Sequence, residues 1–240
     1  MYPMNQNAKD DLVLIPGLGD DALLWQHQVR HLADIATLRV ADVSKSESIA
    51  ALATEFLDTA PPRFSLCGFS LGGYVALHIH RKAPERVRRL ALIGTNARAD
   101  TEARKAKRIA LLGKLREPDG FRRVLGSQLK ELVAPESLDN EALRNTIIDM
   151  GLRVGPEVFA RQNRACMGRS SSLEHLGNIK CPTLVMCGRQ DAAAPIEMSA
   201  QIAEGIPGSR FIVVEDAGHY VQLERPQAVT ALLRHWLQYS

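Results

Sequence analysis

The stretch RFSLCGFSLGGYVALH, residues 63–78, places a serine between glycines where two hydrophobic patterns meet. Its first part, FSLCG, is a nearly continuous apolar run of strand length, and the part that begins LGGYVAL has helical spacing. Ser70 therefore occupies a sharp turn from a strand into a helix, with Gly68 and Gly72 two positions before and after it. This Gly-x-Ser-x-Gly arrangement is typical of a nucleophile elbow.

The residue types suit the geometry of such a turn. A sharp strand-to-helix turn forces the backbone of Ser70 into a strained conformation, and side chains at positions 68 and 72 would collide with it. The turn holds the hydroxyl at the carboxyl end of a sheet, where the next helix begins with unpaired N–H groups and the positive end of its dipole. We therefore expect Ser70 to be a nucleophile and the Leu71 N–H to receive an oxyanion.

Strand-like and helix-like segments alternate along the rest of the chain. Apolar runs of strand length occur at 12–15, 37–41, 64–68, 89–94, 183–188 and 210–215. Helical spacing occurs at 21–34, 48–59, 71–83, 197–206 and 226–238. The alternation predicts an α/β fold with a mostly parallel sheet of about six strands flanked by helices, and the continuous apolarity predicts strands buried on both faces.

One long interval interrupts this alternation. From Thr95 to about Gly177 the chain has helical periodicity and no convincing strand. The helical segments lie near 100–113, 118–133, 139–153 and 156–168. We expect residues 1–95 and 177–240 to form one core domain, and residues 96–176 to form a helical cap, or lid, inserted into it.

Two candidate partners of Ser70 follow the last two predicted strands. Asp191 lies in GRQDAAAP and His219 lies in DAGHYVQLERP, each in the first loop after its strand. A serine hydroxyl is a weak nucleophile until a base removes its proton, and the base needs an acid to orient it. The order Ser, Asp, His along the chain is that of the α/β-hydrolases, so we expect these three residues to form a catalytic triad.

Five motifs carry a resemblance to one family. PGLGDD, GFSLGGYVAL, APERVRRLALIGTNARAD, CPTLVMCGRQD and AGHYVQLERPQAV occur in this order over nearly the whole chain. Together they resemble the α/β-hydrolase fold family, specifically its small esterase-like members with a helical cap inserted after the sixth strand of the family's sheet.

Two departures from the family pattern change the expectation. The family's oxyanion loop commonly reads His-Gly, whereas this chain has Pro16 and Gly17 before Leu18, so the anchoring that the histidine normally provides must come from elsewhere. The Leu18 N–H is the candidate second oxyanion donor, because Gly17 lets the backbone approach the substrate. Only eleven residues precede the run at 12–15, so we expect the family's N-terminal β-hairpin to be missing and six parallel strands to begin at the family's third.

The resemblance implies a serine hydrolase that cleaves a small carboxylic ester through an acyl-enzyme. Lactone or enol-lactone hydrolysis and the hydrolysis of a carbon–carbon bond are alternatives that use the same triad. Serine at position 70 argues against the haloalkane dehalogenase and epoxide hydrolase branches, which need aspartate there. A non-hydrolytic ligand-binding receptor on the same fold is the alternative from another class, and the complete triad argues against it.

The cap supplies candidate substrate-binding residues. We expect Met150 and Phe159 to contribute to an apolar pocket, and Arg161 or Arg164 to meet a substrate carboxylate. The segment 98–130 has ten Lys or Arg residues against four acids. This imbalance either draws anionic substrates toward the cap or forms a solvated helix surface.

Composition narrows the remaining choices. A chain of 240 residues with 45% hydrophobic residues can bury one large core, and a net charge of +3 with 5% aromatic residues disfavours nucleic acid as a partner. The start, MYPMNQNAKDD, lacks a signal peptide pattern, and no run approaches the roughly 18 apolar residues of a membrane span. We expect a cytoplasmic monomer or homodimer that binds a small-molecule substrate, with no membrane attachment, no metal and no cofactor.

Overall fold

A computed structural model describes residues 9–239 and places six strands in one sheet. The strands are β1 (Asp10–Ile15), β2 (Ala36–Val40), β3 (Phe64–Phe69), β4 (Val87–Ile93), β5 (Thr183–Gly188) and β6 (Arg210–Val214). They pair in the order β2-β1-β3-β4-β5-β6, and every neighbouring pair is parallel. The six predicted parallel strands are confirmed. Residues 1–8, which make up most of the segment read for a signal peptide, lie outside the described residues.

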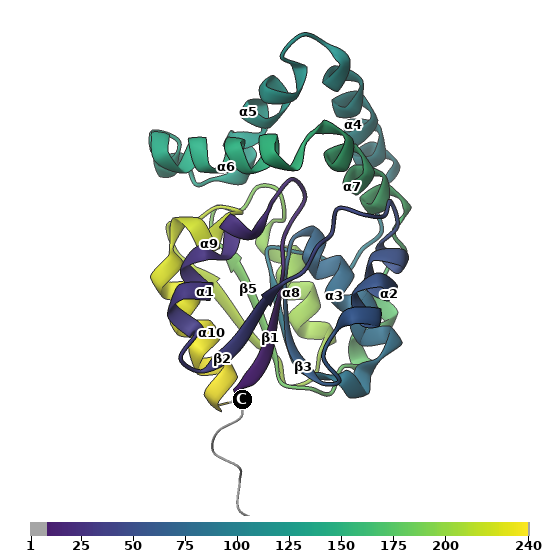
Figure 1. The fold of residues 1–240 in the computed structure, drawn as a ribbon, viewed down its shortest axis with the longest axis vertical. Helices are drawn as coiled ribbons and strands as arrows, with labels where there is room; N and C mark the ends of the chain where they lie inside the picture. The colour runs from purple at the N-terminus through teal and green to yellow at the C-terminus, as the bar shows by residue number, and fades with distance from the viewer. Residues whose placement is uncertain (1–8, 240) are drawn as a thin grey trace, which may run out of the picture.

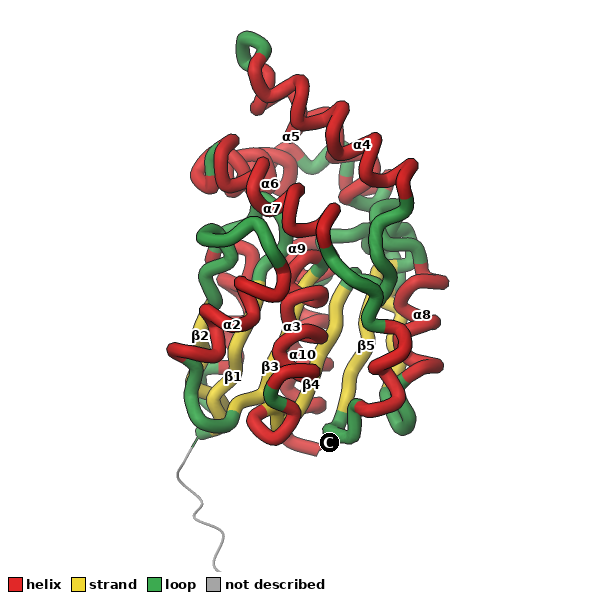
Figure 2. Tube along the Cα trace, turned by 90° about the vertical axis from the view of Figure 1, so that its right-hand side faces the viewer, coloured by secondary structure: helices red, strands yellow, loops and turns green. Residues whose placement is uncertain are grey.

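Helices cover both faces of the sheet (Figures 1 and 2). On one face lie α1 (Gln26–Leu32) and α10 (Pro226–Tyr239), and on the other lie α2 (Ile49–Thr59), α3 (Leu71–Lys82) and α8 (Ile196–Gly205). Successive residues of a strand point to opposite faces. In β1, Leu12 and Leu14 therefore pack toward α1 and α10, whereas Val13 and Ile15 pack toward α2, α3 and α8.

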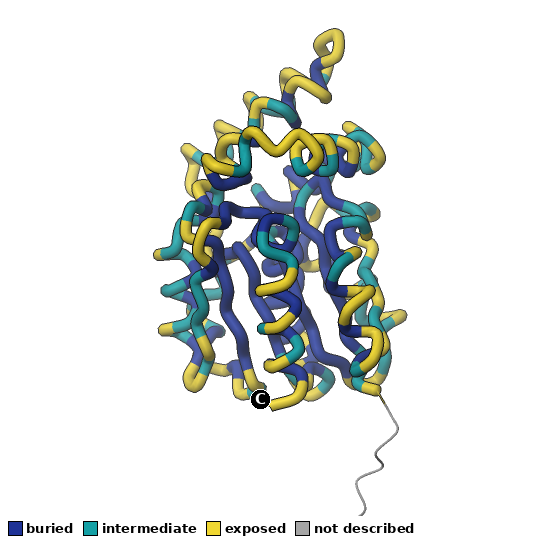
Figure 3. Tube along the Cα trace, turned by 90° about the vertical axis from the view of Figure 1, so that its left-hand side faces the viewer, coloured by how far each residue is buried: buried dark blue, intermediate teal, exposed yellow. Residues whose placement is uncertain are grey.

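The edges of the sheet differ from the prediction. The four central strands are buried over most of their length, and the strands inside the molecule are dark blue in Figure 3. In contrast, β2 and β6 contain exposed or half-buried residues. Each edge strand has one neighbouring strand, and the flanking helices cover it incompletely. The prediction of burial on both faces is therefore wrong for β2 and β6. The predicted helix at 21–34 is also shorter, because a 3₁₀ turn at Ala22–Trp25 precedes α1.

Four helices lie between β4 and β5 in sequence: α4 (Glu102–Gly113), α5 (Gly120–Leu132), α6 (Glu141–Val154) and α7 (Pro156–Gly168). These inserted helices lie together beyond the carboxyl ends of the strands (Figure 1). Two of them begin with ordinary capping residues, since Thr101 and Asn140 accept backbone N–H groups at the starts of α4 and α6. Among residues 9–239, no helix is long and apolar enough to cross a bilayer.

Candidate active site

The turn between β3 and α3 has the conformation that the elbow motif predicts. Ser70 has φ 51° and ψ −113°, a left-handed backbone conformation that is strained for serine. Backbone contacts hold it there: the Ser70 N–H donates to the Ile93 carbonyl oxygen over 3.0 Å, and the Thr95 hydroxyl donates to the Ser70 carbonyl oxygen over 2.8 Å. The end of β4 thus fixes the position of the serine.

The two elbow glycines allow two different close approaches. A Cβ atom at Gly68 would lie 2.3 Å from the carbonyl oxygen of Gly72, so only glycine lets α3 start so close to β3. A Cβ atom at Gly72 would lie 2.3 Å from the carbonyl oxygen of Ile15, at the end of β1. The first contact lies within the elbow, as expected, whereas the second involves a neighbouring strand that the local sequence does not reveal.

Asp191 and His219 converge on Ser70 from the loops after β5 and β6. His219 Nε2 lies 3.0 Å from Ser70 Oγ, and His219 Nδ1 lies 2.8 Å from Asp191 Oδ2. The other oxygen, Asp191 Oδ1, accepts the Ala194 N–H over 2.7 Å. Because a carboxylate only accepts hydrogen bonds, the contact with Asp191 places the ring proton on Nδ1 and leaves Nε2 free to accept from the serine. Asp191 and His219 are both buried.

The loop that carries His219 is tied to the end of α5. The His219 N–H donates to the Leu132 carbonyl oxygen over 3.0 Å. Glu224, in the short helix α9 (Val221–Glu224), accepts the Gly218 N–H and the Ala134 N–H, each over 2.8 Å. This buried carboxylate therefore joins the histidine loop to the inserted helices. Sequence reasoning missed Glu224, because four residues are too few to show helical periodicity.

The loop with Leu18 is anchored by a residue of α7. The Gly19 N–H donates to Gln162 Oε1 over 2.8 Å, and Gln162 Nε2 donates to the Val43 carbonyl oxygen over 3.2 Å. Gln162 is buried and provides an anchor in this chain, which lacks the family's histidine before Gly17. Leu71 is the first residue of α3, so its N–H has no partner within the helix. Both leucines line the same cavity as Ser70.

Comparison with known proteins assigns the family. The model of the alpha/beta hydrolase family matches residues 12–232. The chain belongs to this family. The hydrolase is 29% identical over 254 residues to a 2-hydroxy-6-oxononadienedioate/2-hydroxy-6-oxononatrienedioate hydrolase from Paraburkholderia phymatum, with 96% of this chain and 88% of that protein covered.

Two further similarities are with esterases. The hydrolase is 28% identical over 178 residues to a pimeloyl-[acyl-carrier protein] methyl ester esterase from Neisseria meningitidis, with 72% of this chain and 68% of that protein covered. A thermophilic esterase from Thermogutta terrifontis, solved with malate bound, superimposes with a TM-score of 0.86 at 28% identity, covering 96% of this chain and 90% of that one. The fold and the assignment as a hydrolase are therefore established.

A cavity of about 720 Å³ opens above Ser70 in this hydrolase. Ser70 and His219 lie in its lining, and the inserted helices α4, α5 and α7 supply much of the opposite wall. The side chains on that wall are mixed, with apolar Leu111 and Leu132 beside charged groups such as Arg108. The cavity therefore provides room for a small substrate between the serine and the inserted helices.

The four predicted substrate-binding residues lie away from this cavity. Met150 is fully buried in the apolar core, and Phe159 is buried with its ring edge-on to that of Phe121, 5.3 Å between centroids. Arg161 Nε donates to the Ser44 carbonyl oxygen over 3.1 Å, and Arg164 pairs with Glu47 at 2.6 Å. None of the four is among the described residues that line the cavity.

The orientation of α7 explains why Arg161 and Arg164 do not line the cavity. Asn163 and Cys166 are the α7 residues that line the cavity, and they are spaced three positions apart on one side of the helix. Arg161 and Arg164 share another side, which meets the segment before α2. Periodicity shows which residues share a side of a helix, but it does not show which neighbour that side will meet.

Asp20 is a buried carboxyl group in the cavity wall that sequence reasoning did not select. Its Oδ1 accepts the Tyr220 hydroxyl over 2.7 Å, so it links the Leu18 loop to the histidine loop. Burial raises the pKa of Asp20 from 3.8 to about 7; the Tyr220 hydroxyl, the charge of His219 and the Gly17 amide lower it, and Asp21 raises it. The carboxyl group is therefore protonated in mildly acidic solution.

Replacement of Asp20 by asparagine should remove a pH-dependent loss of stability. Between pH 3.8 and about 7 the folded wild type keeps a proton that the unfolded chain releases. The stabilisation is thus complete at the acidic end and is lost as the pH rises through about 7. From about pH 4 to about pH 8, the free energy of unfolding of the wild type should fall relative to that of Asp20→Asn by on the order of 4 kcal/mol.

Urea unfolding of both proteins across this pH range measures the difference. Tyr220→Phe is the matched variant, because it removes the hydrogen bond that lowers the pKa of Asp20. Its loss of stability should move to higher pH than in the wild type. Parallel curves for wild type and Asp20→Asn would contradict the assignment of this titration to Asp20.

Proposed function

We propose that this hydrolase cleaves a small carboxylic ester, with Ser70 as nucleophile, His219 as base and Asp191 as the residue that orients His219. The observation that carries the proposal is the continuous hydrogen-bonded chain from Ser70 Oγ through the imidazole to the Asp191 carboxylate, with the serine in the lining of the cavity. A nucleophile, a base and an orienting acid in this sequence of contacts are the requirements of acyl transfer.

The proposed reaction has two halves. His219 Nε2 takes the Ser70 proton as Oγ attacks the acyl carbonyl carbon, and the carbonyl electron pair moves onto its oxygen. The N–H groups of Leu18 and Leu71 donate to that oxyanion. The tetrahedral intermediate then expels the alcohol, which takes the proton from His219, and leaves an acyl group on Ser70. In the second half His219 deprotonates water, which attacks the acyl carbon. The bond from that carbon to Ser70 Oγ then breaks, His219 returns the proton to Oγ, and the carboxylic acid is released.

We assign the inserted helices, within residues 96–176, the role of a lid over this reaction. They supply much of the cavity wall opposite Ser70, and the Glu224 carboxylate connects the residue after α5 to the histidine loop. A lid that covers the acyl group excludes bulk water and selects the shape of the substrate. The largely apolar lining nearest the serine, with Phe69, Leu71 and Leu132, suits an acyl chain.

Hydrolysis of a lactone or of a carbon–carbon bond is the second candidate. Similarity over 96% of the chain to a protein named as a 2-hydroxy-6-oxononadienedioate/2-hydroxy-6-oxononatrienedioate hydrolase favours it. The same triad serves both reactions, so the two candidates differ in substrate and not in the residues assigned here.

A fluorophosphonate probe tests the proposed nucleophile. Intact-mass analysis should find one adduct on the wild type and on Ser127→Ala, whose serine lines the same cavity from α5, and none on His219→Ala. The wild type should also hydrolyse p-nitrophenyl esters, with a preferred acyl length set by the cavity. A folded protein that forms no adduct would contradict the assignment of Ser70 as an activated nucleophile. An adduct without ester turnover would support the lactone or carbon–carbon candidate.

A further inference from the structure

Two arginines of the cavity wall, Arg104 and Arg108, and a third arginine outside the described cavity lining, Arg169, surround a single buried carboxylate. The Asp100 side chain is fully buried, and it pairs with Arg108 Nε at 2.7 Å, with Arg169 Nη1 at 2.7 Å and with Arg104 Nε at 3.7 Å. Asp100 and two of the arginines come from α4 or the residues just before it, whereas Arg169 follows α7. We call these four residues the Asp100 cluster.

The Asp100 cluster holds more positive charge than it neutralises. Three guanidinium groups meet one carboxylate, and the side chains of Arg169 and Arg108 are only 4% and 15% exposed. Excess charge that is largely removed from water favours an anion nearby, because the protein interior screens it weakly. The neighbouring acid on the cavity wall, Glu131, pairs with Lys107 at 2.8 Å and therefore does not compensate this excess.

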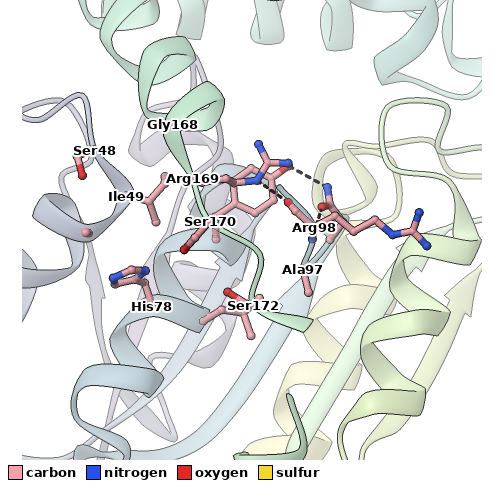
Figure 4. A pocket seen from close by; sticks show the side chains of 13 residues that line it. Ser48, Ile49, His78, Ala97, Arg98, Gly168, Arg169, Ser170 and Ser172 are labelled. Carbon is pink, nitrogen blue, oxygen red and sulfur yellow. Dashed lines mark hydrogen bonds between the residues drawn. The ribbon is translucent and has the colours of Figure 1, made fainter. Parts of the chain in front are cut away.

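The arginines differ in the hydrogen bonds they have available. Arg169 is used structurally: Nε donates to the Arg98 carbonyl oxygen over 2.9 Å (Figure 4), Nη1 donates to the Cys166 carbonyl oxygen, and the guanidinium lies 4.0 Å from the centre of the Tyr74 ring. Arg104 and Arg108 line the cavity. Arg169 therefore supports the cluster, and the other two arginines face the space that a substrate would occupy.

Both cavity-facing arginines keep donors unused within the described part of the chain. Arg108 uses Nε on Asp100 and Nη1 on Asn163 Oδ1, and Arg104 uses Nη2 on the Ala193 carbonyl oxygen. Among residues 9–239, Arg108 Nη2 and Arg104 Nη1 have no hydrogen-bond acceptor. Unused guanidinium donors suit a carboxylate, whose two oxygens accept in a fork.

The Asp100 cluster lies close to the nucleophile along α3. Tyr74 is four residues after Ser70, one helical turn further along the same side, and it also lines the cavity. Arg169 packs on the Tyr74 ring and shares Asp100 with Arg104 and Arg108. Ser70, Arg104 and Arg108 line one cavity, so a single small substrate bound there can meet both the serine and the arginines.

We propose that Arg104 and Arg108 form an anion subsite, and that the substrate carries a carboxylate at the end remote from the bond that is cleaved. This inference rests on the proposed function, since it names the class of substrate for the same cavity. The pair replaces Arg161 and Arg164 as the cationic groups that meet the substrate.

The test compares two p-nitrophenyl esters of similar length, the monoester of adipic acid and the neutral hexanoate. For the wild type we expect kcat/KM to be roughly 10- to 100-fold higher for the adipate monoester. In Arg108→Gln and in Arg104→Gln this ratio should fall toward one. Lys105→Gln is the matched control. Lys105 is also a cationic side chain of α4, but it pairs with Glu102 and is not among the described cavity-lining residues. The ratio of kcat/KM values for this variant should equal that of the wild type.

Further measurements distinguish a failure of the proposed subsite from a failure of the proposed function. Arg104 makes the longest contact with Asp100, so Arg104→Gln remains informative if Arg108→Gln does not fold. Adipate binding to Ser70→Ala tests the subsite without turnover. Adipate should raise the melting temperature of Ser70→Ala, and adding Arg104→Gln to that variant should remove the increase. Equal kcat/KM for the two wild-type esters, or an undiminished ratio in both arginine variants, would overturn the subsite. Loss of turnover and of probe labelling with adipate binding retained would overturn the proposed function and leave the subsite standing.

Discussion

Ser70→Ala is expected to lower kcat/KM for ester hydrolysis by about 10⁴-fold or more, because it removes the hydroxyl that we propose forms the acyl-enzyme. Its hydroxyl is 3.0 Å from His219 Nε2, and the backbone of the elbow does not depend on that contact. The backbone bonds to Ile93 and Thr95 persist in the variant, so the fold and substrate binding should be retained. Steady-state kinetics with p-nitrophenyl esters and the mass of the probe-treated protein measure the effect.

Ser70→Gly provides a control that separates chemistry from conformation. At φ 51° and ψ −113° glycine is unstrained, whereas serine and alanine are strained. Ser70→Gly should therefore be as inactive as Ser70→Ala but more stable by about 1 kcal/mol in urea unfolding. Substantial ester turnover by both variants would show that the nucleophile lies elsewhere.

Asp191→Asn is expected to lower kcat by about 10⁴-fold while the fold remains intact. The Asp191 carboxylate accepts two hydrogen bonds, one from the Ala194 N–H and one from His219 Nδ1. In the variant the amide oxygen can keep the first bond, so the amide NH₂ faces the imidazole and donates to Nδ1. The ring proton then moves to Nε2, where it points at Ser70 Oγ and prevents the ring from acting as a base.

Kinetics and unfolding together test this expectation. KM should change little, the unfolding midpoint should stay near that of the wild type, and probe labelling of Ser70 should slow in proportion to kcat. The double variant Ser70→Ala with Asp191→Asn should be no less active than Ser70→Ala alone, because the two residues act as one unit. If Asp191→Asn keeps most of the wild-type kcat, another acid must orient His219.

Local sequence patterns were sufficient to predict those segments whose environment is the same along their whole length. The six strands are nearly continuous apolar runs because a central parallel sheet buries both faces, and the prediction is wrong only at the edges β2 and β6. The elbow and the order Ser70, Asp191, His219 were also predictable, because the carboxyl ends of parallel strands meet at one edge of the sheet. The structure then brings those three side chains within hydrogen-bonding distance.

The sequence by itself therefore determined the fold, the elbow and the candidate triad of this hydrolase. Only the tertiary structure decided what surrounds them: Gln162 on the Leu18 loop, Glu224 on the histidine loop, and Arg169 beside Asp100. These contacts join residues that are distant along the chain, and they depend on the orientation in which the inserted helices pack on the core. Hydrophobic periodicity shows which residues share one side of a helix, but it does not show which part of the protein that side will contact. The residues that line the cavity could therefore be identified only from the packed helices.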